Sequence, residues 1–234
     1  QLMRYHRYPT ASVTPVTRTC YVEPSTKGTS ATKSLTTQGG VYDWSKMPLI
    51  PEDGVTDEQC RAIGKLTSDA GISVYMGYDT LKAGGSGAFM FNIVRALKEV
   101  FGYASACYYR APQWSDVTKA SGVVRNAMLS NFDAGYPVLM GISGDGGHAI
   151  VGDGYGYKGD TLYVHLNMGW AGSDDFWYNL PNMDTAGFNV VEDVVFNIFP
   201  QGDADTAIIS GRLVDLEGNP VEGATVKLFA TGTG

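Results

Sequence analysis

The hydrophobic pattern of the chain changes its period near residue 136, and this change constrains the fold more than any other feature. Before it, apolar residues recur at helical spacing over 57–70, 89–101 and 121–132. After it, apolar runs bounded by Gly-rich turns predict strands at 137–143, 148–155, 161–167, 176–180 and 190–198. Helices followed by antiparallel strands predict an α+β domain that ends near Pro200.

The two ends of this domain are less regular. The opening residues QLMRYHRYP have the pattern of a helix end that Pro9 stops. Residues 10–38 are rich in Ser, Thr and Pro and predict a long excursion with one hairpin, and 72–78 predict a short strand. After a polar linker at 201–207, residues 208–234 read as strand, turn and strand. Two or three strands cannot bury a core, so we expect this segment to be the beginning of a truncated second domain.

Charge and cysteine content exclude several classes of function. Lys and Arg number 17 against 24 Asp and Glu, so the net charge is −7. Binding to a phosphate backbone needs clustered cations, and we expect no nucleic-acid partner. No apolar run reaches the roughly 18 residues of a membrane span. Cys20, Cys60 and Cys107 have long, unrelated spacings that suit neither a disulfide framework nor a metal site, and no motif requires a metal or an organic cofactor.

Residues that can carry chemistry gather between 144 and 178. His148 follows a Gly-Gly pair at the start of a predicted strand, and Asn167 ends the next strand. Antiparallel pairing of these strands can bring the two residues side by side. We expect the amide oxygen of Asn167 to accept the ring N–H of His148, and Trp170 to shield that bond from water. A histidine held in this way activates a thiol, and Gly147 leaves space beside it for a substrate backbone.

The residues alone leave structural interpretations open. A histidine after a turn is more often structural than catalytic, and an asparagine at a strand end is usually a turn residue. The GDGYG run at 152–156 lies between strands with no helix after it, so it does not indicate a nucleotide site. His6 and His165 have no partners at catalytic or metal-ligand spacing, and we interpret both as structural.

A series of segments in fixed order resembles the streptopain family of papain-like cysteine peptidases, which includes interpain-type bacterial enzymes. The segments are QLMRYHRYP, VYDWSKMPLIP, DAGISVYMGY, VRALKEVFGY, YPVLMGI, GGHAIVGDGY, YVHLNMGWAG and DDFWYNL. The resemblance implies a papain-like catalytic domain over 1–200. Residues 208–230 resemble the opening strands of a carboxypeptidase-regulatory-like domain, an Ig-like β-sandwich.

The resemblance also implies roles for individual residues. His148 falls on the general base of the family, Asn167 on the residue that orients it, and Trp170 on the second Trp of the same motif. Gly147 would offer its backbone to a bound peptide. Ser86, in the AGGSGA loop at 83–88, would contact the substrate.

The chain departs from the family pattern in two ways. Met168 stands where the family usually has Trp, so we expect it on the substrate side of the site, with an altered preference. The family's nucleophilic Cys and its oxyanion-hole Gln fall upstream of Gln1, the Cys by seven positions. None of the three cysteines within the chain has the helix-start context of the nucleophile, and the chain alone is therefore expected to be inactive.

The function implied by the resemblance is that of a cysteine endopeptidase, secreted or held on a bacterial surface and made as a zymogen. Its expected partners are protein or peptide substrates and its own pro-segment. One alternative is a catalytically inactive papain-like binding domain, which Met168 favours slightly and the retained His148, Asn167 and Trp170 disfavour. Another is a thiol amidase or transpeptidase on the same scaffold.

Overall fold

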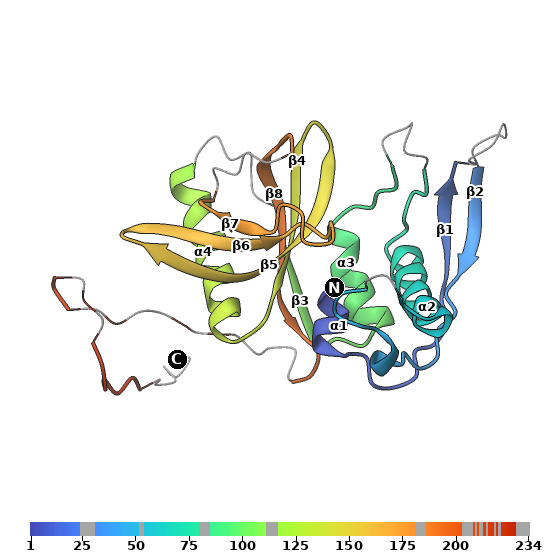
Figure 1. Cartoon of the computed structure of the whole chain (residues 1–234), viewed down its shortest axis with the longest axis horizontal. Helices are drawn as coiled ribbons and strands as arrows, with labels where there is room; N and C mark the ends of the chain where they lie inside the picture. Colours follow the sequence, from blue (N-terminus) through green and yellow to red (C-terminus); the bar gives the residue numbers. More distant parts are fainter. Residues whose placement is uncertain are drawn as a thin grey trace, which may run out of the picture.

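The computed structural model describes residues 1–23, 31–51, 54–79, 85–110, 117–180, 186–202, 208, 210, 213, 215–217, 219 and 221–227. The side chains of 117–124 lie outside this description. The chain forms two lobes, one built on a large curled sheet and one on a helix and a hairpin (Figure 1). The short helix α1 (Leu2–His6) lies between them.

The sheet lobe contains a six-stranded antiparallel sheet in the order β3-β8-β4-β5-β6-β7. Its strands are β3 (Ser105–Arg110), β4 (Val138–Gly144), β5 (Gly147–Lys158), β6 (Thr161–Asn167), β7 (Phe176–Tyr178) and β8 (Phe188–Phe199). The register of β5 against β6 shifts at a bulge between Gly152 and Gly154. The predicted strands after residue 136 are confirmed with small shifts of their ends, whereas β3 was not predicted.

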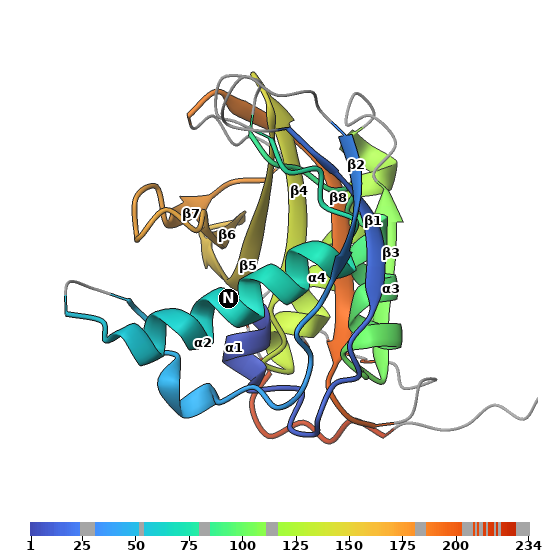
Figure 2. The same ribbon diagram turned by 90° about the vertical axis from the view of Figure 1, so that its right-hand side faces the viewer.

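The other lobe, here called the helical lobe, combines α2 (Asp57–Ser73), the antiparallel hairpin of β1 (Thr17–Val22) and β2 (Ala31–Thr36), and the 3-10 turn η1 (Trp44–Lys46). The hairpin expected within 10–38 is thus confirmed. Helix α3 (Phe91–Arg95) continues into the π-helical turn η3 (Ala96–Val100), and both pack beside the sheet (Figure 2).

Two buried clusters lie on opposite faces of the sheet. Leu97 of η3 packs with Val195 of β8 on one face. Met128 of α4 (Val117–Asp133) packs with Val194 on the other. Because successive residues of a strand point to opposite faces, β8 contributes to both clusters. The architecture is α+β, as predicted.

Helix α2 is longer than its sequence pattern predicts. Thr56 caps its start in a reciprocal arrangement with Gln59, so the helix begins at Asp57. It then runs to Ser73, beyond the predicted end at residue 70, and the strand predicted over 72–78 is wrong. A Cβ atom at Gly71 would lie 2.7 Å from the hydroxyl oxygen of Tyr78. Glycine at 71 thus serves a close approach rather than a helix end.

A buried carboxylate joins α2 to the segment after β2. Asp69 has no exposed surface and accepts hydrogen bonds from Gln38 N (2.7 Å), Gly39 N (3.0 Å) and the Tyr42 hydroxyl (2.8 Å). Burial and the bond to Asp69 raise the pKa of Tyr42. The packing of this lobe therefore depends on the Asp69 carboxylate, whose two oxygens both accept hydrogen bonds; we call it the polar hub.

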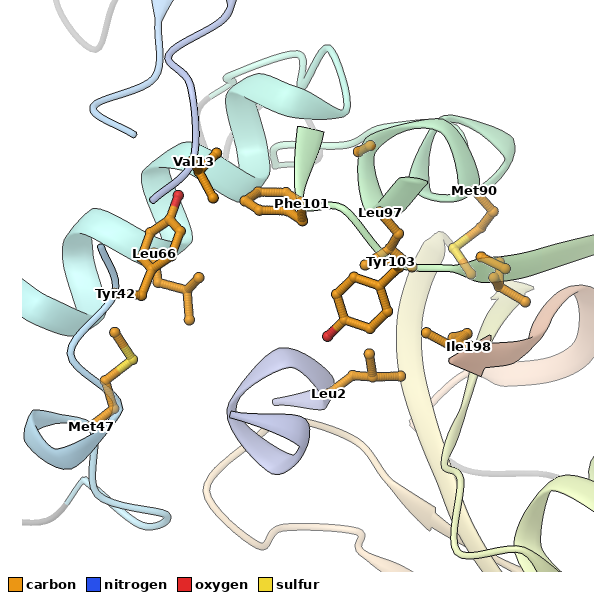
Figure 3. Close-up of a cluster of buried hydrophobic side chains, with 13 residues drawn as sticks. Leu2, Val13, Tyr42, Met47, Leu66, Met90, Leu97, Phe101, Tyr103 and Ile198 are labelled. Carbon is orange, nitrogen blue, oxygen red and sulfur yellow. The ribbon is translucent and has the colours of Figure 1, made fainter. Parts of the chain in front are cut away.

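Helix α1 is anchored by apolar and aromatic contacts. Leu2 points from α1 toward Tyr103 and Ile198 (Figure 3). The ring of His6 stacks on Tyr136 and meets Tyr103 edge-on, with both centroid distances at 5.9 Å. Burial lowers the pKa of His6 to about 4. Within the described residues, His6 Nε2 and the Tyr103 hydroxyl have no hydrogen-bond partner, which agrees with a structural role for this histidine.

The segment after 202 is described only in part, and 203–207 of the expected linker lie outside the described residues. The Asp215 carboxylate accepts N–H groups from Glu217 and Asn219, and Val221 N donates to Leu213 O. These bonds join residues on either side of the predicted turn, and the described residues there carry no assigned strand. A β-sandwich over 208–234 stays a prediction. Across the described part of the chain, no helix has the length and apolar character needed to span a bilayer.

Candidate active site

His148 lies at the start of β5, directly after a glycine-rich turn. It pairs with Ile142 of β4. Glycine is required at 144, the last residue of β4, because a Cβ atom there would lie 1.9 Å from Gly187 O. By contrast, a Cβ atom at Gly147 would meet nothing within 4 Å. The surface at Gly147 is therefore open.

The imidazole of His148 is held by one hydrogen bond and one ring stack. Its Nε2 lies 2.8 Å from Met168 O, and because a carbonyl only accepts, Nε2 carries the proton. Trp170 stacks on the ring with centroids 4.9 Å apart and planes 23° apart. Phe188 lies against the same ring at 5.8 Å. Among the described residues, Nδ1 has no hydrogen-bond partner, so it is the nitrogen left for another group.

Asn167 does not bond His148 directly, which corrects the predicted contact. Its Oδ1 accepts the N–H of Gly169 at 3.0 Å and the side-chain amide of Gln1 at 2.6 Å. The cause is register, because Asn167 pairs with Val151 of β5 rather than with His148. The chain then turns at Gly169, with φ at 78°, and brings the Met168 carbonyl to the ring.

Met168 was predicted on the substrate side of the site, and its burial shows that this is wrong. Its side chain is 0% exposed and packs in the sheet-lobe core with Met140 and Ile150. Its main chain carries the contacts instead, with the carbonyl on His148 and the N–H donated to Asp175 Oδ1 at 2.6 Å. Sequence reasoning missed Asp175. An acid that ends a Gly-rich loop just before a strand was the available signal.

Ser86 is exposed, and its hydroxyl accepts the N–H of Asp79 at 3.2 Å. Gly87 next to it pairs with Gly77 through two backbone hydrogen bonds. The first residues of the loop predicted at 83–88, Ala83 and Gly84, lie outside the described residues. Contact of Ser86 or Gly147 with a substrate stays a prediction.

The start of α1 adjoins the loop that holds His148. The Gln1 amide donates to Asn167, and a Cβ atom at Gly169 would lie 3.7 Å from Gln1 Nε2. In Figure 1 the N-terminus is drawn close to the loop after β6. The two lobes therefore meet at this point, with Asn167 contacting both α1 and the peptide group bonded to His148.

Comparison with known proteins decides the family. The model of the Peptidase C10 family matches residues 1–178, a range that includes His148, Asn167 and Trp170. The chain belongs to the peptidase C10 family. Within this family, the chain is similar to the cysteine peptidases of the streptopain group.

Curated C10-type relatives are considerably longer than this chain. The thiol protease/hemagglutinin PrtT of Porphyromonas gingivalis is 29% identical over 197 residues, covering 78% of this chain and 21% of the relative. Streptopain of Streptococcus pyogenes is 28% identical over 210 residues, covering 86% of this chain and 50% of the relative. The chain thus spans half or less of the length of these proteins.

Solved structures match the fold. A prointerpain A fragment of Prevotella intermedia superposes with a TM-score of 0.68 and 25% identity, covering 86% of this chain and 61% of that one. Active wild-type interpain A of the same organism gives 0.66 and 24%, covering 84% of this chain and 78% of that one. The α+β fold of this C10 chain is thus that of papain-like interpain cysteine proteases.

None of the three cysteines of this C10 chain lies near His148 in the sheet. Cys20 is buried on β1 and Cys60 is exposed on α2. Cys107 is on β3, three strands away from β5, or roughly 14 Å at the usual strand spacing. No group of three or more His, Cys, Asp or Glu side chains in the described part of the chain could hold a metal ion.

His165 belongs to a separate contact. Its Nδ1 lies 2.6 Å from Asp153 Oδ1, and its ring meets Trp177 at 5.2 Å. It pairs with Gly154 across the β5–β6 ladder rather than with any residue around His148. This arrangement agrees with the structural role expected for His165.

Proposed function

We propose that this chain is the main part of the catalytic domain of a cysteine endopeptidase, whose nucleophilic Cys precedes Gln1. The observation that carries the proposal is the state of His148. Its Nε2 is committed to the Met168 carbonyl, its ring is stacked on Trp170, and its Nδ1 is left without a partner among the described residues. The loop that holds it contacts the start of α1, the helix that in the family carries the nucleophile.

The proposed reaction uses this geometry directly. Nδ1 of His148 takes the thiol proton, and the thiolate attacks the carbonyl carbon of the scissile peptide bond. When the C–N bond breaks, the imidazolium returns the proton to the leaving amine nitrogen. Water then hydrolyses the thioester, with His148 accepting a proton from the water and returning it to the departing sulfur. The Met168 carbonyl keeps the tautomer and stabilises the imidazolium.

Substrate binding is proposed for the open surface next to the base. Gly147 has no neighbour that would obstruct a peptide backbone, and the same holds for Gly146. Ser86 is exposed and offers a hydroxyl on the other lobe. A peptide bound across both lobes would place its carbonyl beside His148.

The organisation of the longer protein follows the same proposal. Residues 1–200 form the peptidase domain, 201–207 a linker, and 208–234 the start of an Ig-like β-sandwich. The protein is proposed to be secreted or attached to a bacterial surface and made as a zymogen with its own pro-segment. The relatives come from bacteria, and one structural neighbour is a pro-form, which supports this assignment.

The binding-domain alternative loses the argument that favoured it. That argument was the replacement of a family Trp by Met168 in the site. Because the Met168 side chain is wholly buried, the replacement changes the core of the sheet lobe and leaves the contacts of His148 intact.

The test uses the protein extended upstream of Gln1 and a quenched fluorescent peptide mixture. His148→Ala should lower kcat/KM by about 10³-fold, the usual range for loss of a general base. His165→Ala, which removes the other histidine of the sheet, should stay within about twofold of wild type, since His165 contacts Asp153 and Trp177 instead. Full activity in His148→Ala would overturn the proposal.

A further inference from the structure

The hydrogen bond that orients His148 ends on a loop rather than on a strand. Its acceptor, Met168 O, is the first residue after β6, and the loop continues to the start of β7. Four residues of this loop have positive φ angles: Gly169 at 78°, Ala171 at 54°, Gly172 at 90° and Asp174 at 60°. Such a loop holds a carbonyl in one direction only if other contacts fix the peptide groups on either side.

Asp175 fixes the peptide group that precedes this carbonyl. Its Oδ1 accepts the N–H of Met168 at 2.6 Å. A carboxylate is a strong acceptor, and this bond joins the two ends of the loop, because Asp175 directly precedes β7. Asp175 is partly buried, so water competes less for the bond.

Asn167 fixes the next peptide group. The N–H of Gly169, which it accepts at 3.0 Å, belongs to the same peptide unit as the Met168 carbonyl. Met168 lies between these two peptide groups in the chain, and its side chain is buried in the core of the sheet lobe. Met168 is thus held by its side chain, by its N–H and through the following peptide, and its carbonyl is left to receive His148.

We propose that Asp175 is a positioning residue for His148, acting through the main chain of Met168. By holding the Met168 N–H, it keeps the neighbouring carbonyl aimed at Nε2, which fixes the ring orientation and the Nε2–H tautomer. Nδ1 is then directed away from that carbonyl and toward the nucleophile. The catalytic consequence rests on the proposed function, while the orientation of the ring does not.

The test of orientation uses the chain as it stands, without any activity. The sequence has three histidines, so a ¹⁵N spectrum of the imidazoles contains three sets of ring signals. In the wild-type chain near pH 8, His148 should show the shifts of a single Nε2–H tautomer. Asp175→Ala should move them toward values averaged over both tautomers, whereas Asp175→Asn, whose amide oxygen can still accept the N–H, should keep them. The signals of His6 and His165 serve as internal references.

The matched control removes a carboxylate at the opposite end of the β5–β6 hairpin. Asp160→Asn lies in the turn after β5 and should leave all three sets of signals unchanged. If Asp175→Ala does not fold, Asp175→Ser makes the same test, because its hydroxyl is too short to reach across the loop. An unchanged single tautomer in whichever of these two variants folds would overturn the proposal.

A kinetic experiment on the upstream-extended protein separates this proposal from the proposed function. Asp175→Ala should lower kcat by about 10- to 100-fold with KM within about twofold, and Asp175→Asn should recover most of kcat. Loss of the tautomer in a protein that is no peptidase would refute the proposed function and leave the positioning role standing. A retained tautomer with lowered kcat would refute the positioning role alone.

Discussion

The two lobes that meet at His148 are stabilised in different ways. On the sheet side the core is aliphatic and thioether, with Val138, Val164 and Met168 wholly buried. On the helical side, polar and titratable groups share the interior: Asp69 at the end of α2, and His6 with Tyr103 around α1. His148 therefore stands on a lobe whose wholly buried side chains, among the described residues, are not titratable, whereas the other lobe contains the wholly buried carboxylate of Asp69. A fall in pH, or a substitution of these polar groups, should consequently disturb the position of α1 before it disturbs His148.

The largest effect should come from removing the polar hub of the helical lobe. Asp69→Ala leaves the Gln38 and Gly39 N–H groups and the Tyr42 hydroxyl without their buried acceptor. We expect a loss of about 3–5 kcal/mol in the free energy of unfolding, measured as a lower urea midpoint at constant m-value. Asp133→Asn, at the end of α4, is the control and should stay within about 0.5 kcal/mol. A midpoint shift no larger than that of the control would show that the hub does not stabilise this lobe.

A somewhat smaller effect should follow truncation in the sheet core. Met168→Ala deletes a wholly buried side chain and should cost about 2–4 kcal/mol of stability, whereas Met168→Leu, of similar volume, should cost less than about 1.5. Both variants keep the main-chain carbonyl that His148 uses. If Met168→Leu lowers kcat/KM tenfold while unfolding at the wild-type urea concentration, the side chain contacts the substrate after all.

The sequence predicted the sheet lobe more accurately than the helical lobe, for a physical reason. Strands β4 to β7 pair with their neighbours in the chain, their apolar residues alternate, and glycines mark the turns, so local patterns suffice. The strand that was not predicted, β3, pairs only with β8, which comes from far along the chain. In the helical lobe, Gly71 looks like a helix stop, and only its close approach to the Tyr78 hydroxyl explains why glycine stands there.

The contact between His148 and Trp170 could be predicted from the sequence, whereas the hydrogen bonds around His148 could not. His148 and Trp170 come together as expected. The bond of His148 to a main-chain carbonyl depends on the register of Asn167 and the turn at Gly169, which no side-chain pattern encodes. For the same reason, the burial of Met168 inside a conspicuous motif could not be predicted.

The smallest effect on stability is the pH dependence from His6. Its pKa is about 4 in the folded protein, below the ordinary value of 6.5, because burial disfavours the charged ring. The contribution is therefore fully present above pH 6.5 and is lost as the pH falls toward 4, where the unfolded chain binds the proton first. After allowance for the solvent contact that the ring retains, about 2 kcal/mol should be lost.

The check is the free energy of unfolding, measured by urea denaturation from pH 7.5 to 4 in wild type and in His6→Phe. The phenyl ring can keep the stack on Tyr136 and removes the titrating group. The variant should lose less stability than wild type across this range by about the amount stated. Parallel curves for the two proteins would mean that His6 is not the titrating group.

The central claim is that His148 activates a thiol that precedes Gln1, and one labelling experiment tests it most directly. The upstream-extended protein is treated briefly with a thiol alkylating reagent, and the modified residue is located by peptide mass mapping. The account predicts rapid labelling of a single upstream Cys, strongly slowed by His148→Ala, with Cys20, Cys60 and Cys107 labelled far more slowly. Rapid labelling of one of these three instead, or a rate at the upstream Cys that is the same in His148→Ala, would contradict it.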